Sequence, residues 1–282
     1  MSSQTQDAKQ LTAPDIRALK GVRKLCMMTA YDYPTARLVD QSGMDMILVG
    51  DSLAMVVLGY EDTLSLTMEE MLHHTRAAAR GTRHALLVSD MPFLSYQVSM
   101  EQAVRNAGRF LSEGRAKAVK VEGGRDFAPH IKAMVRAGIP VMGHLGLTPQ
   151  YMATLGGFKA QGRSSEAVLC LLDDAKALED AGVFSIVLEA IPNEAAALIT
   201  DAVSVPTIGI GAGNMTDGQV LVLHDMLGLF DRFVPRFVKQ YAQMGSQIVK
   251  AMGKYVEDVR SGAFPAEEHS LHLSKEECAK LK

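Results

Sequence analysis

The sequence predicts a single parallel (β/α)8 TIM barrel with an N-terminal leader helix and a long C-terminal helix. Two observations lead to this fold: eight short apolar runs end in a polar residue or glycine, and amphipathic helical stretches lie between most of them. Strands that alternate with helices form a parallel sheet, and eight such strands close into a barrel more readily than into an open sheet. The chain length of 282 residues agrees with this fold, since a barrel typically needs roughly 250.

The predicted strands are expected to be buried, because each is a continuous apolar run of the kind that parallel sheets require. They cover residues 24–30, 46–51, 85–90, 118–123, 140–144, 184–189, 206–211 and 220–225. Helical periodicity separates most of them, for example over 68–80, 100–114 and 166–182. Only a short glycine-rich loop around 211–218 joins the last two strands. The final unit is therefore expected to be irregular, or the strand count to differ by one.

The two ends of the chain are expected to extend the barrel without forming separate domains. Residues 1–22 contain a short leader helix around 15–20, and residues 236–261 have the periodicity of a long amphipathic helix. The final segment, 262–282, is a polar tail. We therefore expect residues 1–282 to form one catalytic barrel domain.

The composition excludes several classes of partner. Hydrophobic residues make up 48% of the chain and charged residues 22%, and the net charge of -3 comes from intermixed signs. No basic patch favours nucleic acid, and no polybasic segment favours an anionic lipid surface. No apolar run approaches the roughly 18 residues of a membrane span. The expected partner is a small molecule.

Cysteine usage favours a reducing compartment. The three cysteines, Cys26, Cys170 and Cys278, are widely spaced and form no CxxC pair, which argues against a disulfide framework and against a thiolate metal site. The N-terminal residues 1–10 are polar and contain no apolar targeting stretch. The protein is therefore expected in the cytoplasm.

Ionisable residues end five of the predicted strands, which is where the catalytic groups of a barrel lie. They are Asp51, Asp90, Glu122, His144 and Glu189. Carboxylates that meet at one barrel mouth raise one another's pKa unless a cation compensates their charge. Two or three carboxylate ligands, with water and substrate completing an octahedron, suit Mg²⁺ better than Zn²⁺. The sequence therefore predicts a magnesium site at which the substrate binds the metal.

The alternative is that each acidic residue caps the next helix or faces solvent, but four at equivalent positions make that explanation weaker. His144 stands in no HxH or HExxH motif, so it is expected to be a structural or hydrogen-bonding residue and not a metal ligand. His73 and His74 lie in a helical stretch and are expected at the surface.

Lys120 lies two residues before Glu122, so an extended strand places both side chains on the same side. A lysine beside a metal site can bind the carboxylate of a substrate. Two alternatives stay open: a buried salt bridge with Glu122, which is compatible with substrate binding, and a Schiff-base nucleophile as in metal-independent barrel aldolases. The surrounding carboxylates favour the metal-dependent interpretation over the Schiff base.

The glycine-rich segment 209–214, GIGAGN, allows two interpretations. Barrel phosphate sites often use the loop after the seventh strand, and glycine backbone can cradle a phosphate. The segment is not GxGxxG, however, and a tight turn in crowded backbone explains it at least as well.

Longer motifs carry a specific resemblance that runs in order from about residue 12 to residue 272. They are TAYDYPTA (29–36), ILVGDSL (47–53), MEEMLHHTRAAARG (68–81), VKVEGG (119–124), GHLGLTPQ (143–150), GGFKAQGR (156–163) and IGIGAGNMTDGQVLVLHD (208–225). Together they resemble the ketopantoate hydroxymethyltransferase family. The resemblance implies a Mg²⁺-dependent barrel that transfers a hydroxymethyl unit from 5,10-methylenetetrahydrofolate to 3-methyl-2-oxobutanoate. The products would be 2-dehydropantoate and tetrahydrofolate, on the way to pantothenate and coenzyme A.

The resemblance also implies a role for each strand-end residue. The metal ligands fall on Asp51, Asp90 and Glu122, the last directly or through water. Substrate contacts fall on Asp51, Ser52, Asp90 and Lys120. The catalytic base falls on Glu189. Family members assemble into homo-oligomers, commonly homodecamers, and the apolar face of 236–261 is expected to form an interface or to cover the barrel.

The implied chemistry is of the aldol type. A 2-oxo acid that chelates Mg²⁺ becomes acidic at the carbon next to its keto group, Glu189 removes that proton, and the resulting enolate attacks the methylene carbon of the folate. Lys120 and Ser52 hold the substrate carboxylate. Ala54 stands where the family has glycine after DSL, so the loop that carries Ser52 is expected to differ locally.

Two other functions stay open on the sequence. A Mg²⁺ barrel of the phosphoenolpyruvate mutase or isocitrate lyase type uses similar strand-end carboxylates on other small 2-oxo acids. A barrel that only binds a 2-oxo acid as a sensor is the second, and the intact Glu189 argues against it.

Overall fold

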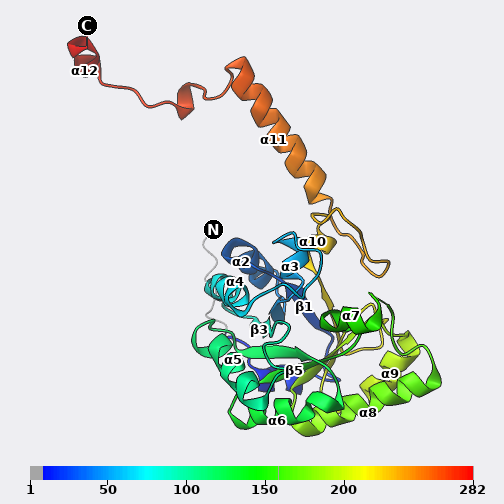
Figure 1. The fold of residues 1–282 in the computed structure, drawn as a ribbon. Helices are drawn as coiled ribbons and strands as arrows, with labels where there is room; N and C mark the ends of the chain where they lie inside the picture. The colour runs from blue at the N-terminus through cyan, green and yellow to red at the C-terminus, as the bar shows by residue number, and fades with distance from the viewer. Residues whose placement is uncertain (1–8, 158, 282) are drawn as a thin grey trace. The chain divides into compact units, whose positions relative to one another are not determined.

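The computed structural model describes residues 9–157 and 159–281 and contains the predicted closed barrel. Its eight parallel strands are hydrogen-bonded in chain order, and the eighth pairs with the first (Figure 1). The strands are β1 (Leu25–Thr29), β2 (Met46–Val49), β3 (Leu86–Asp90), β4 (Ala118–Glu122), β5 (Val141–Gly146), β6 (Ser185–Glu189), β7 (Thr207–Ile210) and β8 (Gly218–Leu221). The predicted fold class is confirmed.

Local sequence signals set the ends of the helices around the barrel. Thr67 and Glu70 form a capping box at the start of one, and Ser164 caps a second, which ends at Gly182 with a φ of 98°. The helices are α1 (Ala13–Ala18), α2 (Tyr33–Gln41), α3 (Leu53–Val56), α4 (Met68–Gly81), α5 (Met100–Ser112), η1 (Arg125–Phe127), α6 (Ala128–Arg136), η2 (Pro149–Tyr151), α7 (Met152–Leu155), α8 (Ser165–Ala181) and α9 (Asn193–Ala202).

The described residues form two compact units. The first contains the barrel and extends to Leu223, together with Pro235–Val238; the second comprises His224–Val234 and the residues from Lys239 onward. The second unit contains α11 (Met244–Ser261), η3 (Glu267–His269) and α12 (Lys275–Lys280), and α10 (Leu223–Met226) begins at the boundary. The assignment of residues 1–282 to one domain stays a prediction.

The predicted position of the eighth strand is shifted. Sequence periodicity predicts 220–225, whereas β8 covers Gly218–Leu221 because its pairing with β1 begins at Leu25 and Gly218. The chain then turns into α10 from Leu223. The irregular final unit is confirmed, since residues 211–217, all of which the structure describes, contain no helix.

The long C-terminal helix begins later than its periodicity predicts. It starts at Met244 and not at residue 236. Tyr241 donates its backbone N–H to the carbonyl of Met226 at 2.9 Å, and Met244 donates to Leu227 at 2.8 Å. These backbone groups pair with the preceding segment, which a helix through them would not allow.

Helix α1 belongs to the leader segment and packs on the barrel interior. Thr12 caps it in a capping box with Asp15, and its residues Ala13 and Ile16 are buried in one cluster with strand residues such as Leu25 and Ile208. Leu25 begins its strand, so α1 lies at the N-terminal end of the barrel. The catalytic groups are therefore expected at the opposite, C-terminal end, where barrel enzymes place them.

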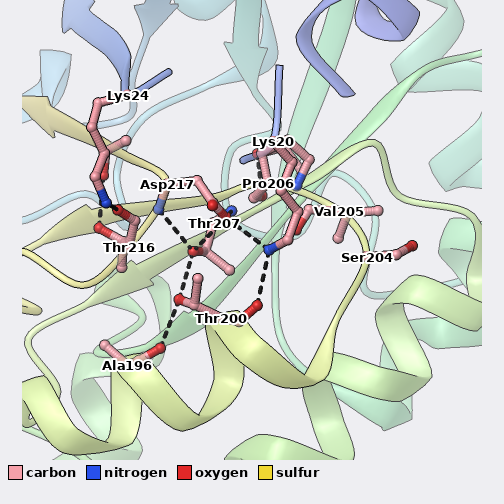
Figure 2. A network of polar contacts seen from close by, with 12 residues as sticks. Lys20, Lys24, Ala196, Thr200, Ser204, Val205, Pro206, Thr207, Thr216 and Asp217 are labelled. Carbon is pink, nitrogen blue, oxygen red and sulfur yellow. Dashed lines mark hydrogen bonds and ion pairs between the residues drawn. The ribbon is translucent and has the colours of Figure 1, made fainter. Parts of the chain in front are cut away.

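A polar network fastens the segment after α1 to the last barrel unit (Figure 2). Lys20 Nζ donates to the carbonyl oxygens of Thr200 at 2.9 Å and Val205 at 3.1 Å, and to Asp217 Oδ2 at 2.8 Å. The same Asp217 oxygen accepts the backbone N–H of Thr207 at 2.9 Å. All three hydrogens of one ammonium group are thus used, and they join α9 to the starts of β7 and β8.

Candidate active site

The ionisable residues predicted at the strand ends gather at the C-terminal mouth of the barrel. Asp51 follows β2, Asp90 ends β3, Glu122 ends β4 and Glu189 ends β6. The first three are 5%, 2% and 1% exposed, whereas the side chain of Glu189 is 18% exposed. Buried carboxylates cost free energy unless a positive charge or hydrogen bonds compensate them. The groups that contact these carboxylates therefore determine the chemistry of the barrel mouth.

Asp51 and Asp90 are held side by side. The backbone N–H of Asp51 donates to Asp90 Oδ2 at 2.9 Å. Gly50 permits this approach, because a Cβ there would lie 2.9 Å from Ser52 Oγ and 3.5 Å from Asp90 Oδ2. Burial raises the pKa of Asp51 to about 8, with the charges of Glu122 and Asp90 adding to it, and burial also raises the pKa of Asp90.

Lys120 is the cation inside this cluster. Its Nζ lies 3.0 Å from Asp90 Oδ1, and the two residues are in register on β3 and β4. Burial acts to lower the pKa of Lys120, but the charges of Asp90, Glu122 and Asp51 outweigh it and raise that pKa. A lysine that stays protonated is a poor nucleophile, so the site disfavours a Schiff base. The salt bridge considered from the sequence exists, but its partner is Asp90 and not Glu122.

His144 lies between this cluster and Glu189. Its Nδ1 is 3.1 Å from Lys120 Nζ and 3.3 Å from Glu122 Oε1, and its Nε2 is 3.2 Å from Glu189 Oε2. Burial and the charge of Lys120 lower the pKa of His144, but the adjacent carboxylates of Glu122 and Glu189 raise it overall, to about 9. A protonated ring donates from both nitrogens. His144 thus links Glu122 to Glu189, which is the hydrogen-bonding position expected from the sequence.

Glu189 is followed by a constrained turn. Ala190 has a φ of 48°, in the left-handed region that non-glycine residues occupy at a cost in free energy. Its N–H donates to the carbonyl of Ile210 at 2.9 Å, and its carbonyl accepts the N–H of Gln161 at 3.0 Å. These bonds hold the backbone from which the Glu189 side chain reaches the mouth.

Ser52 lies at the start of α3 beside Asp51. Its Oγ is 2.8 Å from the hydroxyl of Tyr31. Ala54 is fully buried, and its N–H donates to the Asp51 carbonyl at 2.9 Å within a helical turn. Alanine favours such a turn over glycine, so this departure from the family pattern supports the local helix next to Ser52.

The prediction of a surface position is wrong for one of the two adjacent histidines. His73 is exposed, whereas His74 is half-buried and its Nδ1 lies 2.7 Å from the backbone carbonyl of Tyr31. The periodicity of α4 alone did not reveal this contact, because it depends on the loop after β1.

Gln150 is a site residue that the sequence reasoning did not identify. It is 3% exposed, and its Nε2 donates to Asp51 Oδ2 at 3.1 Å and to the carbonyl of Met91 at 2.9 Å. Its backbone N–H donates to Glu122 Oε2 at 3.0 Å. Tyr96 donates its hydroxyl to Gln150 Oε1 at 3.1 Å. The only sequence signal was its place in the GHLGLTPQ motif.

The carboxylate cluster fits a hard cation in charge and chemistry. Three buried carboxylates surround one lysine, and neither Asp90 Oδ1 nor Glu122 Oε1 has a hydrogen-bond partner of good geometry. Within residues 9–157 and 159–281, however, no three His, Cys, Asp or Glu side chains are arranged to hold a metal together. The chain therefore offers oxygen ligands for a cation whose coordination needs further ligands, as Mg²⁺ usually does.

The glycine-rich segment 209–214 forms a tight turn. Gly211 and Gly213 have positive φ angles of 63° and 75°, and a Cβ at Gly213 would lie 2.0 Å from Asn193 Oδ1. The carbonyl of Gly213 accepts a hydrogen bond from Gln219 Nε2 at 2.8 Å. The positive φ angles and the neighbouring side chains thus account for these glycines, and the geometry favours the turn over a phosphate cradle.

A cavity of about 400 Å³ lies between the end of β5 and the start of α8. Its lining residues are Gly146, Gln161, Gly162, Ser164, Glu166, Ala167, Cys170 and Leu171. Gly146 ends β5 and is in register with Glu189 on β6. The N–H of the next residue, Leu147, donates to the carbonyl of Glu189 at 2.8 Å. The cavity therefore borders the C-terminal mouth, one strand away from Glu189.

Comparison with known proteins identifies relatives across nearly the whole chain. The family model described as ketopantoate hydroxymethyltransferase matches residues 10–267. The chain is 62% identical over 272 residues to 3-methyl-2-oxobutanoate hydroxymethyltransferase of Syntrophobacter fumaroxidans, with 96% of each chain covered. It is 58% identical to the protein of that name from Oleidesulfovibrio alaskensis, which covers 96% of this chain and 94% of the relative.

Solved structures share the fold at much lower identity. Phosphonopyruvate hydrolase in complex with oxalate and Mg²⁺ is 14% identical, with a TM-score of 0.61 over 96% of this chain and 98% of that one. In the part of the chain that the structure describes, no helix is long and apolar enough to cross a membrane. The family match and the identity to these relatives both extend over most of the sequence, so the chain belongs to the ketopantoate hydroxymethyltransferase family.

Proposed function

We propose that this protein transfers a hydroxymethyl unit from 5,10-methylenetetrahydrofolate to 3-methyl-2-oxobutanoate, giving 2-dehydropantoate and tetrahydrofolate. The observation that carries the proposal is the division of the barrel mouth into two parts. Asp51, Asp90, Glu122 and Lys120 form a buried charged cluster, and Glu189 lies apart from it, connected through His144. One part suits binding of a 2-oxo acid, and the other supplies a base. The name of the relatives, 3-methyl-2-oxobutanoate hydroxymethyltransferase, supports the same substrate.

The cluster would hold one Mg²⁺ through Asp51 and Asp90, with Glu122 contributing directly or through a water. When bound, the cation draws electron density from the keto group of the substrate and so makes the adjacent C–H more acidic. Its presence would also offset the mutual repulsion of three carboxylates. A phosphonopyruvate hydrolase structure of the same fold is in complex with Mg²⁺, which supports a magnesium-dependent barrel but not particular ligands.

The side chains of the chain perform the remaining tasks. Lys120 and Ser52 bind the carboxylate of the keto acid and orient its reactive carbon. Glu189 Oε2 takes the proton from that carbon, and His144 Nε2, at 3.2 Å, holds this oxygen in place. The enolate carbon then forms a bond to the methylene carbon of the donor, and water releases the hydroxymethyl product with tetrahydrofolate.

The direct test is formation of 2-dehydropantoate, followed by mass spectrometry with both substrates and Mg²⁺. We expect product only when the keto acid, the methylenetetrahydrofolate and the metal are all present. Addition of EDTA should abolish it, and Mg²⁺ should restore it. Treatment with borohydride in the presence of the keto acid should not label Lys120. Turnover that persists in EDTA, or covalent trapping on Lys120, would contradict the proposal.

The rival function is that of a phosphoenolpyruvate mutase or isocitrate lyase type of barrel. 2,3-Dimethylmalate lyase, described as a member of that superfamily, shares the fold with this chain at 16% identity, which carries no argument about substrate. The family match and relatives of 55–62% identity favour the hydroxymethyl transfer. Incubation with phosphonopyruvate or 2-methylisocitrate and no folate distinguishes the two, since we expect no cleavage of either acid.

We further propose that the protein is cytoplasmic and forms a homo-oligomer, a decamer by resemblance to its family. The described cysteines are unpaired, which agrees with a reducing compartment. In the second unit, α11 has no buried residue, and its exposed apolar side chains include Val249, Met252 and Tyr255. Such a face is unusual for a helix left in water. Light scattering after size-exclusion chromatography should give a mass of about ten subunits; a monomer would contradict it.

A further inference from the structure

We propose that the cavity beside Glu189 binds the pterin ring of the one-carbon donor. This inference rests on the proposed hydroxymethyl transfer and adds to it the place where the second substrate binds. The first argument is position. Among the residues that line the cavity, Gly146 belongs to a barrel strand, and it is paired with Glu189 in the sheet. A ring in this cavity would therefore lie beside the strand whose last residue is the proposed base.

The second argument is that the edge of the cavity is hydrogen-bonded to the backbone that carries the base. Leu147 donates to the carbonyl of Glu189 at 2.8 Å, and Gln161 donates to the carbonyl of Ala190 at 3.0 Å. Two segments of the cavity rim are therefore hydrogen-bonded to the same two residues that place the base. Gly146, with a φ of 96°, keeps this border thin, because a Cβ there would lie 2.2 Å from the Glu189 carbonyl oxygen.

The third argument is size and chemistry. A volume of about 400 Å³ is within the range of small-molecule sites. Ala167, Leu171 and Cys170 lie at i, i+4 and i+3 on one face of α8 and provide a largely apolar wall for a flat ring. Glu166 and Gln161 add polar groups at its edge. A carboxylate there can accept hydrogen bonds from the ring N–H and amino groups of a pterin, whereas it would repel a phosphate or the glutamate tail of the donor.

Cys170 allows a direct test, because it is exposed and lines the cavity. The other cysteines, Cys26 and Cys278, are replaced by alanine so that a bulky maleimide reacts at Cys170 alone. Two activities are then measured: exchange of the proton next to the keto group in D₂O without folate, and complete hydroxymethyl transfer. We expect the label to reduce transfer by at least roughly tenfold while leaving exchange unchanged. A blocked donor site should slow only the steps that need the folate, and proton exchange does not need it.

A variant that also carries Cys170→Ala is the matched control, and treatment with the same reagent should change neither of its two activities. Glu166→Gln supplies an independent measurement without a label. It should weaken binding of 5-formyltetrahydrofolate in calorimetry by roughly tenfold or more, as loss of a charged hydrogen bond does, with exchange unchanged. Transfer at the unlabelled rate after complete modification would overturn the inference, as would equal losses of exchange and transfer. Exchange without transfer in the unmodified wild-type enzyme would instead contradict the proposed function.

An independent observation concerns Gln150, and here the structure assigns a positioning role. The residue lies on the loop after β5, in η2, yet it contacts the C-terminal ends of β2, β3 and β4. Its amide nitrogen donates to Asp51 Oδ2 and to the Met91 carbonyl, and its backbone N–H donates to Glu122 Oε2. Gln150 therefore sets the distance between two of the proposed ligand carboxylates. A neutral amide can do this without cancelling the negative charge that a cation needs.

The remaining contacts of Gln150 fix the direction of its amide. Its Oε1 accepts hydrogen bonds from the Tyr96 hydroxyl at 3.1 Å and from Gln97 Nε2 at 3.0 Å. Since this oxygen is held by two donors, the nitrogen must point toward Asp51 and Met91. Tyr96 itself accepts the backbone N–H of Glu122 at 3.1 Å. The carboxylates are thus supported by a buried network that ends on the half-buried Gln97.

Binding of Mn²⁺ alone, followed by electron paramagnetic resonance, tests this role without turnover. We expect Gln150→Leu to weaken Mn²⁺ binding at least roughly tenfold, the usual effect of losing a residue that orients a metal ligand. Gln219→Leu removes an amide whose nitrogen donates to the Gly213 carbonyl, outside the network around the carboxylates, and it should bind Mn²⁺ as the wild type does. The melting temperature of the metal-free variants reports any loss of folding. If Gln150→Leu lowered that temperature but bound Mn²⁺ normally, the residue would be purely structural and the inference wrong; a wild type that bound no Mn²⁺ would contradict the proposed metal site instead.

Discussion

The two ends of the barrel compensate their charged side chains in different ways: the pair at the N-terminal end is half-buried, whereas the cluster at the C-terminal end is buried. At the N-terminal end, Lys20 meets Asp217, and all three hydrogens of the ammonium group have acceptors. At the C-terminal end, the carboxyl groups of Asp51, Asp90 and Glu122 face the single lysine Lys120, and burial together with their mutual repulsion raises the pKa of Asp51 to about 8. One end is electrostatically complete and closed by α1. The other is incomplete until a cation and an anionic substrate arrive, which is where a barrel places its chemistry.

Among substitutions that test the difference between the two ends, Lys120→Met should have the largest effect on activity. The substitution keeps the length of the side chain but removes the charge that faces Asp90, so the keto acid would lose the partner of its carboxylate. We expect kcat/KM for hydroxymethyl transfer to fall by roughly 10³-fold or more, since both charge pairing and orientation are lost. Steady-state kinetics measures it. A fall of less than about tenfold would show that Lys120 only supports the fold.

The corresponding change at the closed end is Asp217→Asn. It should lower the free energy of unfolding by roughly 1–3 kcal/mol, because Lys20 keeps its charge but loses the anionic partner. Turnover per folded molecule should not change. Glu101→Gln removes an exposed ion pair with Arg105 and serves as the control, with an expected effect below about 0.5 kcal/mol. Urea denaturation compares them. An Asp217→Asn enzyme that folds normally but is inactive would break the division between the two ends.

Alanine substitutions at two glycines distinguish the effect of backbone strain from the effect of displacing Glu189. Gly146 and Gly138 both have positive φ, so alanine is strained at either site and should lower the stability by about 1 kcal/mol. A Cβ at Gly138 meets nothing within 4 Å, whereas one at Gly146 would lie 2.2 Å from the carbonyl of Glu189. Only Gly146→Ala should therefore also lower kcat, by roughly tenfold or more. Equal activity of the two variants would contradict a precise placement of Glu189.

The pH dependence of stability gives a smaller effect with a definite sign. Burial, with Glu122 and Asp90, raises the pKa of Asp51 to about 8 from 3.8. A folded-state pKa above the unfolded value contributes stability that is fully present below about pH 4 and is lost as the pH rises through about 8. The melting temperature of the metal-free protein should therefore fall between about pH 6 and about pH 8.5, and the fall should be smaller in Asp51→Asn.

Mg²⁺ binding should depend on pH in the opposite direction to the stability of the metal-free protein. The metal competes with the proton on Asp51, so its affinity should increase by up to about tenfold per pH unit below pH 8, as one proton is released. Calorimetry in buffers of different ionisation enthalpy measures the released proton. An affinity that is independent of pH would contradict the protonation of the metal-free cluster.

The sequence was sufficient for the fold class and for the set of strand-end residues, because both follow from local periodicity. The apolar runs are buried on both faces as parallel strands require, and the residue that ends each run must lie at the same mouth. The shifted β8 and the late start of α11 show the limit of this reasoning. Their boundaries depend on pairing with β1 and on backbone bonds to Met226 and Leu227, which local periodicity does not contain.

Contacts between side chains on different strands and loops also could not be predicted from the sequence. Lys120 pairs with Asp90 because β3 and β4 place these two residues in register, whereas spacing along one strand pointed to Glu122. Gln150 reaches Asp51 from 99 residues away in sequence. Neither register nor loop path can be read from one segment, so these partners became visible only in the folded barrel. The roles of Asp51, Ser52, Asp90, Lys120, Glu122 and Glu189 in binding and catalysis stay predictions.

The central claim is that the incomplete charge at the C-terminal mouth activates a 2-oxo acid for proton removal by Glu189. Exchange of the proton next to the keto group of 3-methyl-2-oxobutanoate, followed by NMR in D₂O with Mg²⁺ and no folate, tests it most directly. We expect exchange in the wild type, and a loss of roughly 10²–10⁴-fold in Glu189→Gln, the usual contribution of a general base. Exchange at the wild-type rate in Glu189→Gln would contradict the assignment of the base.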